Sequence, residues 1–241
     1  MKRKTVVLLW GGERTVFQPV LGRPLGAYAL EAVCRVGPEA VLVCAGAEDA
    51  GRDGWEALIK GVETGTPVFL LPGEKRKSAR RPGILEALAT ARDVLEKYPD
   101  RDIIAVPADR PMLRDRTLKA LLRVHTVKGS SLTFLSGGEE MGLAGVLALR
   151  SADVFPLLPA VPRARAAAGF GALALRLTKA GKKVGFYECP DPVEALPAGD
   201  SVAVGRAARE LRRRKNESLA RGGVIFLDPA SAWIDWAVRI G

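Results

Sequence analysis

The sequence is poor in the residues that build metal clusters and disulfide scaffolds. Its 241 residues include three cysteines and one histidine, and Cys34, Cys44 and Cys189 form no close-spaced pattern. A thiolate metal centre and a disulfide framework are therefore excluded as organising features. Reduced thiols in a cytoplasmic protein are the expectation.

Long apolar runs are also missing. The basic first residues lead into an apolar stretch that covers only Val6–Trp10. This stretch is far shorter than the roughly 20 residues of a membrane-spanning helix, and it is too short for a signal peptide. We expect a buried strand here and no membrane partner.

Acidic residues are scarce relative to basic ones. The chain has 37 Lys and Arg against 27 Asp and Glu, a formal net charge of +10. A positive surface attracts nucleotides, phosphorylated metabolites or nucleic acid. The same excess is typical of Arg- and Ala-rich chains from GC-rich or heat-adapted genomes, so charge alone does not select a partner.

Apolar runs and amphipathic stretches alternate through the first half of the chain. Continuous apolar runs that end at glycine or proline indicate buried strands, and a period of 3.6 residues indicates helices. Strands are predicted at 5–10, 40–45, 67–71 and 102–106, and helices at 24–36, 48–60, 83–98 and 114–127. This alternation predicts an α/β protein with a Rossmann-like doubly wound, mostly parallel mixed sheet and helices on both faces.

The second half follows a different pattern and ends in an apolar tail. Strands are predicted at 131–135, 143–149, 184–188 and 224–227, and helices at 164–180 and 202–221. With no internal repeat or linker, we expect one domain, 1–223, and a C-terminal tail, 224–241. Trp233 and Trp236 make the tail apolar enough to fold back on the domain or to pair between subunits as a homo-oligomer.

A glycine turn follows the first predicted strand, at Trp10-Gly11-Gly12-Glu13-Arg14. In open parallel sheets, ligands bind beyond the carboxyl ends of the strands. Paired glycines let backbone N–H groups approach phosphate oxygens closely, and an arginine can add a bidentate contact. The alternative is an ordinary turn, and the absence of a following Gly-Lys-Ser/Thr excludes a Walker loop.

Ala108-Asp109 follows the fourth predicted strand, within the segment VPADRPML. A carboxylate at this position points into the same crevice as the glycine turn. Mg²⁺ prefers one or two carboxylates together with phosphate oxygens, so Asp109 suits a nucleotide-bound metal. A turn aspartate is the alternative.

Together these segments resemble the sugar-phosphate nucleotidyltransferases and the molybdenum cofactor guanylyltransferases. VVLLWGGERTVFQPVLGRPLGAYAL is similar to their strand, glycine loop and "PKxLxPVxGKPL" segment, and PADRPML is similar to their "GDxPLL". The similarity is greatest to the N-terminal domain of bacterial N-acetylglucosamine-1-phosphate uridylyltransferase. It continues to the end of the chain, where the tail looks like the start of a left-handed β-helix.

The resemblance implies roles for individual residues. Gly11, Gly12 and Arg14 match the loop that binds the triphosphate, and Asp109 matches the first metal-binding aspartate. Asp200 falls where the family has its second metal ligand. Gly83 closes the segment that stands in the place of the base-recognition loop, which here carries the basic run Lys75–Arg81.

The sequence also departs from the family pattern. Thr15 stands where the family has a phosphate-binding lysine, and no acidic residue occurs between Val154 and Tyr187, where a sugar-contacting glutamate is expected. Acetylglucosamine phosphate is therefore a poor candidate acceptor. His125, at the end of a predicted helix, is expected to be a surface or cap residue.

The sequence thus predicts a Mg²⁺-dependent nucleotidyltransferase that acts on a nucleoside triphosphate and a phosphorylated small molecule. A nucleotide-binding or regulatory domain of the same fold with weakened catalysis is the alternative. A nucleic-acid-binding protein that uses the basic loop and the basic helix around Arg212–Lys215 is a third reading, disfavoured by the absence of interleaved aromatic residues.

Overall fold

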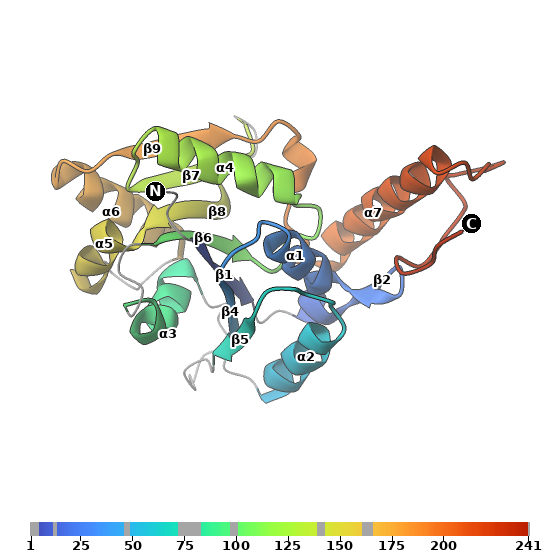
Figure 1. Ribbon diagram of the computed structural model, residues 1–241, viewed down its shortest axis with the longest axis horizontal. Helices are drawn as coiled ribbons and strands as arrows, with labels where there is room; N and C mark the ends of the chain where they lie inside the picture. The colour runs from blue at the N-terminus through green and yellow to red at the C-terminus, as the bar shows by residue number, and fades with distance from the viewer. Residues whose placement is uncertain are drawn as a thin grey trace.

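The centre of the molecule is a seven-stranded sheet in the order β5-β4-β1-β6-β8-β7-β9 (Figure 1). The computed structural model describes residues 5–11, 14–45, 49–71, 83–96, 101–138, 143–160 and 166–240. The strands are β1 (Thr5–Gly11), β4 (Ala40–Ala45), β5 (Val68–Leu71), β6 (Asp102–Pro107), β7 (Leu132–Ser136), β8 (Leu143–Arg150) and β9 (Val184–Glu188). Strands β1, β4, β5 and β6 are parallel, and β8 runs antiparallel between β6 and β7. The predicted α/β class with a mostly parallel mixed sheet is confirmed.

Both faces of β1 are buried, which explains its uninterrupted apolar sequence. Successive side chains of a strand point to opposite faces. Val7 and Leu9 belong to one apolar cluster and Leu8 and Trp10 to another, and none of the four is more than 7% exposed. A strand covered on both faces favours apolar residues at successive positions.

Helices cover the two faces in two groups (Figure 1). The first cluster is completed by α1 (Leu25–Cys34), α2 (Asp49–Lys60) and α4 (Asp115–Val127). The second is completed by α3 (Ile84–Leu95), α5 (Ser151–Val154), the 3-10 helix η2 (Phe155–Ala160) and α6 (Ala166–Lys179). The predicted placement of helices on both faces is therefore confirmed. None of the helices that the structure describes is long and apolar enough to cross a membrane.

A third apolar cluster lies where the long helix α7 (Ser201–Arg221) meets the hairpin of β2 (Pro19–Val20) and β3 (Arg23–Pro24). The tail after α7 turns back to this hairpin (Figure 1). The backbone N–H of Trp236 donates to the carbonyl of Leu21 at 2.8 Å, and the Trp236 ring meets Tyr28 edge-on at 5.0 Å between centroids. Of the outcomes predicted for the tail, folding back on the domain is thus observed for this part of it.

Two sequence predictions are wrong. Residues 224–227 form no strand, because the chain leaves α7 away from the sheet and finds no strand to pair with. Ile225 and Leu227 are 90% and 102% exposed. His125 is fully buried rather than at the surface, because its Nδ1 lies 2.9 Å from Thr133 Oγ1 under α4. The division of the chain at residue 223 remains a prediction.

Candidate functional site

The carboxyl ends of β1 and β6 lie side by side and bring the two predicted motifs together. Trp10 is the register partner of Pro107, and the backbone N–H of Ala108 donates to the carbonyl of Trp10 at 2.7 Å. A Cβ atom built on Gly11 would lie 3.0 Å from Ala108 Cβ. The glycine end of β1 and the turn that carries Asp109 are therefore in contact at one edge of the sheet.

A side chain of α2 also contacts Gly11. The Trp55 indole N–H donates to the Gly11 carbonyl at 3.4 Å, and the fully buried Trp55 ring meets Phe17 edge-on at 5.7 Å. Phe17 ends the 3-10 helix η1 (Arg14–Phe17), in which the side chain of Arg14 is exposed. These contacts hold Gly11, at the end of β1, and Phe17, at the end of η1. Gly12 and Glu13 lie outside the described residues.

Asp109 is 9% exposed and forms an ion pair with the neighbouring Arg110. The Arg110 Nε–H donates to the Ala144 carbonyl at 3.0 Å, which anchors the guanidinium to β8. Gly145, next along β8, has a φ of +75° and its built Cβ would lie 3.4 Å from Pro107 Cγ. The backbone at Gly145 thus adopts a left-handed conformation, which favours glycine, where β8 passes the Asp109 turn. The sequence alone did not single out this position.

Asp200 is the N-cap of α7, where its Oδ1 accepts the backbone N–H of Ala203 at 2.8 Å. The segment that leads into this cap contacts the Asp109 turn, because the Ala198 N–H donates to the Asp109 carbonyl at 2.8 Å. The two predicted metal ligands therefore lie on adjoining segments. Among the described residues, no group of three or more His, Cys, Asp or Glu side chains could hold a metal on its own. Phosphate oxygens would have to supply further ligands, as is usual for Mg²⁺.

Gly83 begins α3 as its N-cap, with an extended backbone at φ −84° and ψ 169°. Helix α3 packs on the face of the sheet that carries Trp10, and Ile84, the residue after Gly83, belongs to the same apolar cluster as Trp10. The predicted base-recognition segment before it, including Lys75–Arg81, lies outside the described residues.

Glu194 is a buried charged residue that the sequence analysis missed. It is 1% exposed in the 3-10 helix η3 (Pro192–Ala195), and its Oε2 accepts the Thr117 hydroxyl at 2.6 Å and the Arg114 backbone N–H at 3.0 Å. Its Oε1 lies 3.5 Å from the Arg114 guanidinium and 3.6 Å from that of Arg116. This carboxylate ties the start of α4, just after the Asp109 turn, to the segment that leads to Asp200.

The three thiols are unpaired and unsuited to nucleophilic catalysis. Burial raises the pKa of Cys34 to about 11 and that of Cys44 to about 12, and it also raises the pKa of Cys189. A catalytic cysteine needs the opposite shift, because the thiolate is the reactive form. The three cysteines are therefore not candidates for a catalytic nucleophile.

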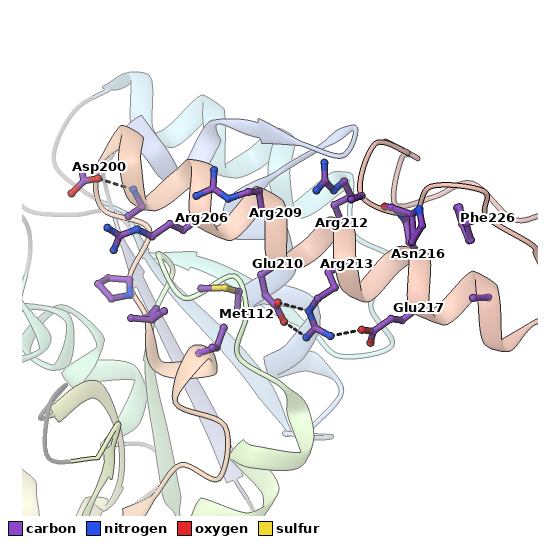
Figure 2. Close-up of a pocket in the computed structure, with 17 residues that line it drawn as sticks. Met112, Asp200, Arg206, Arg209, Glu210, Arg212, Arg213, Asn216, Glu217 and Phe226 are labelled. Atoms are coloured by element: carbon purple, nitrogen blue, oxygen red, sulfur yellow. Dashed lines mark hydrogen bonds and ion pairs between the residues drawn. The ribbon is translucent and has the colours of Figure 1, made fainter.

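A groove of about 1000 Å³ runs along α7 (Figure 2). Met112, Val193 and Leu196 form part of its wall, and Asp200 lies at one end. Arg212 stacks on Trp233 at 4.5 Å from the ring centroid, and Arg213 forms ion pairs with Glu210 and Glu217. These basic side chains are thus engaged within the chain, which weakens the reading of α7 as a nucleic-acid-binding helix.

No protein-family model matches the chain. Among curated proteins, it is 26% identical to the bifunctional protein GlmU of Lactobacillus johnsonii over an alignment of 281 residues, which covers 99% of this chain and 58% of that protein. It is 27% identical to GlmU of Thermobifida fusca over 98% of this chain and 56% of that one. A segment of 65 residues is 52% identical to GlmU of Lactobacillus delbrueckii subsp. bulgaricus, covering 27% of this chain and 14% of that protein. The chain therefore spans a little over half the length of the curated relatives that it matches end to end.

Solved structures share the architecture at low sequence identity. The structure of CMP:2-keto-3-deoxy-manno-octonic acid synthetase complexed with CTP matches with a TM-score of 0.62 at 15% identity, over 88% of this chain and 99% of that one. A nucleotidyl transferase from Methanothermobacter thermautotrophicus, Mth528, matches with a TM-score of 0.65 at 15% identity, over 88% and 100% of the two chains.

The sheet order, the glycine turn after β1 and the acidic turn after β6 thus define a protein with the nucleotidyltransferase fold. Within this fold, the chain is a distant homologue of the GlmU proteins over nearly its whole length.

Proposed function

We propose that the protein is a Mg²⁺-dependent nucleotidyltransferase that transfers a nucleoside monophosphate from a nucleoside triphosphate to a phosphorylated small molecule. The observation that supports the proposal is the contact of Gly11, at the end of β1, with Ala108, the residue before Asp109. Ligands of open parallel sheets bind at this edge. A triphosphate held by the turn would have a carboxylate within its reach.

In the proposed site, each group has one task. The backbone N–H groups of the turn from Trp10 to Glu13, together with Arg14, hold the phosphates, and Gly83 allows the backbone to approach the base. Asp109 and Asp200 supply hard carboxylate oxygens, which fit Mg²⁺. Bound Mg²⁺ would neutralise charge on the phosphate oxygens. Arg110, held beside Asp109, adds a cation at the same place.

In the transfer step, an oxygen of the acceptor phosphate forms a bond to the α-phosphorus. The bond from that phosphorus to the oxygen shared with the β-phosphate breaks, and pyrophosphate leaves with the electron pair. An acceptor phosphate is already ionised at neutral pH, so no general base is required. The protein acts by positioning the reactants and neutralising charge, and three inert thiols are compatible with that chemistry.

Pyrophosphate release, measured with each of the four triphosphates, Mg²⁺ and a set of sugar phosphates, tests the proposal. We expect release with at least one pair of substrates, and a fall of about 100-fold or more in Asp109→Asn, because a preorganised charge at a phosphoryl-transfer site has an effect of this order. Asp93→Asn, the same change on the exposed side of α3, is the matched control. Full activity in Asp109→Asn would refute the role of Asp109.

A nucleotide-binding domain without turnover is the second candidate. Thr15 stands where the resembling family has a lysine, and Asp109 is already engaged by Arg110. Thermal stabilisation by a triphosphate, strengthened by Mg²⁺ and lost in Asp109→Asn, without pyrophosphate release from any substrate pair, would support this candidate. Release of pyrophosphate would refute it.

A further inference from the structure

One side of α7 presents a regular row of side chains to the groove. Figure 2 shows Glu210, Arg213 and Glu217 on the same side of the helix, linked by ion pairs. The row that lines the groove continues in both directions and consists of Ala203, Arg206, Glu210, Arg213, Glu217 and Ala220. Positions three and four residues apart lie on one face of a helix, so these six residues form a continuous stripe, here called the α7 stripe.

At each charged position, the α7 stripe carries the opposite charge to the same stripe read in the reverse direction. Read forwards the stripe is Ala-Arg-Glu-Arg-Glu-Ala, and read backwards it is Ala-Glu-Arg-Glu-Arg-Ala. A second copy of α7 running antiparallel therefore sets Arg206 against Glu217, and Glu210 against Arg213. Ala203 meets Ala220 at each end, where small side chains allow close approach. A parallel arrangement in the same register would set like charges against each other.

Three of the four charged side chains of the stripe are accessible to a second copy, whereas Glu210 is 15% exposed and is paired with Arg213 and Arg214 of its own chain. Arg213 and Glu217 have side chains that are 53% and 45% exposed, and Arg206 is exposed as well. In the part of the chain that the structure describes, no carboxylate lies within ion-pair distance of Arg206. Arg206 is thus a cation in the stripe whose charge complement would come from another chain.

Apolar surface lies beside the stripe and at both ends of the helix. The partly buried Val193 and Leu196 line the groove next to α7, and Met112 there is only 2% exposed. Val202, at the start of the helix, is 66% exposed, and Ile225, just beyond its end, is 90% exposed. An antiparallel pair of helices brings the start of one helix to the end of the other, which would place these two exposed apolar residues near each other.

We propose that the α7 stripe is a two-fold interface through which two copies of this chain associate. The contact would run along the 18 residues from Ala203 to Ala220, or roughly 27 Å at the helical rise of 1.5 Å per residue. The same surface serves on both copies, so the assembly closes as a dimer. The apolar groove supplies buried area, and the alternating charges select the antiparallel register. A uniformly acidic or basic partner would match only half of the stripe.

The mass of the full chain in solution, measured by light scattering and sedimentation over a range of concentrations, tests this interface. We expect a concentration-dependent dimer of the wild-type chain. In Arg206→Glu, the new carboxylate would face Glu217 of the second copy. In Glu217→Arg, the new guanidinium would face Arg206 of the second copy. Each single change should weaken the dimer about tenfold or more, because like charges placed across an interface are strongly unfavourable. Arg123→Glu, the same reversal at an exposed position of α4, should leave the dimer unchanged.

The decisive experiment mixes the two single variants. In a mixed dimer every charged pair of the stripe is again complementary, so an equimolar mixture should recover the wild-type dimerisation constant, whereas each variant alone should dimerise about tenfold more weakly or worse. The double variant Arg206→Glu with Glu217→Arg should recover it as well. Circular dichroism of each variant reports that it is folded.

Several results would overturn the proposal. A wild-type chain that stays monomeric over the whole concentration range, or that forms trimers, contradicts a two-fold interface. A dimer whose mass is unchanged by either charge reversal would use another surface, such as the exposed end of the tail. Folded single variants that do not recover the dimer on mixing would refute the antiparallel register. None of these outcomes depends on whether the protein transfers nucleotides.

Discussion

The contact between Gly11 and Ala108 can be tested by adding one methyl group. In Gly11→Ala, the new Cβ would lie 3.0 Å from Ala108 Cβ, whereas its next neighbours, Val16 Cγ2 at 3.5 Å and Trp55 Cζ2 at 3.7 Å, are at ordinary contact distances. Only the contact between the ends of β1 and β6 therefore has to widen to accept the methyl group. Forcing a methyl group into a packed site of this kind costs about 1–3 kcal/mol of unfolding free energy.

The measurement is urea unfolding together with thermal melting. In a chain of 241 residues a loss of 1 kcal/mol lowers the melting temperature by about 2–4 °C, so we expect a fall of roughly 2–12 °C. Gly171→Ala on the exposed face of α6 is the control, because no atom lies within 4 Å of its built Cβ. That change should stabilise the protein by about 0.5–1 kcal/mol, since alanine is favoured over glycine inside a helix.

A second substitution separates this contact from other effects of alanine at position 11. Ala108→Gly removes the opposing methyl group and should by itself cost about 1 kcal/mol, through the lost methyl and the added backbone freedom. If the two turns touch as described, the double variant should be at least about 1 kcal/mol more stable than the sum of the single losses implies. Strict additivity of the two changes would refute the contact, and with it the shared site.

Two further predictions concern stability. Glu194→Gln should lower the unfolding free energy by about 2 kcal/mol, because the Thr117 hydroxyl and the Arg114 N–H would lose a charged acceptor. Urea unfolding of this variant measures the loss, and an unchanged midpoint would contradict the role of Glu194. The pKa of the buried Cys44 thiol is raised from 9.0 to about 12 in the folded protein, so its contribution to stability is complete below pH 9 and is lost as the pH rises from 9 towards 12. The unfolding free energy should therefore fall above pH 9, less steeply in Cys44→Ala, and equal slopes in the two proteins would refute this assignment.

The elements that could be predicted best from the sequence are strands that are buried on both faces of the sheet. Residues 5–10 could be assigned to a strand because Leu8 and Leu9 are buried on opposite faces of the sheet, which leaves an uninterrupted apolar run. The meeting of the Trp10 and Asp109 turns followed from the general placement of strand ends in a parallel sheet. Local pattern was therefore sufficient for the fold class and for the main contact of the site.

The features that the sequence did not predict depend on partners far along the chain. Glu194 is buried because it meets Thr117 on another helix, 77 residues earlier, and nothing in its own neighbourhood indicates this. His125 is buried because Thr133 and Asp102 come from two strands beneath α4. Apolar residues at 224–227 have the composition of a strand, but composition does not reveal that no neighbouring strand is within reach.

The backbone amide of Trp236 gives a built-in reporter for the opposite end of the chain. This N–H is bonded to Leu21 in the hairpin that follows η1, and Asp235 lies against Gly22 in the same hairpin. Any molecule that stiffens the hairpin would slow hydrogen exchange at this amide and alter the emission of the indole beside Tyr28. Occupancy near the first strand could thus be followed from the C-terminal segment, without a label and without knowing the molecule beforehand.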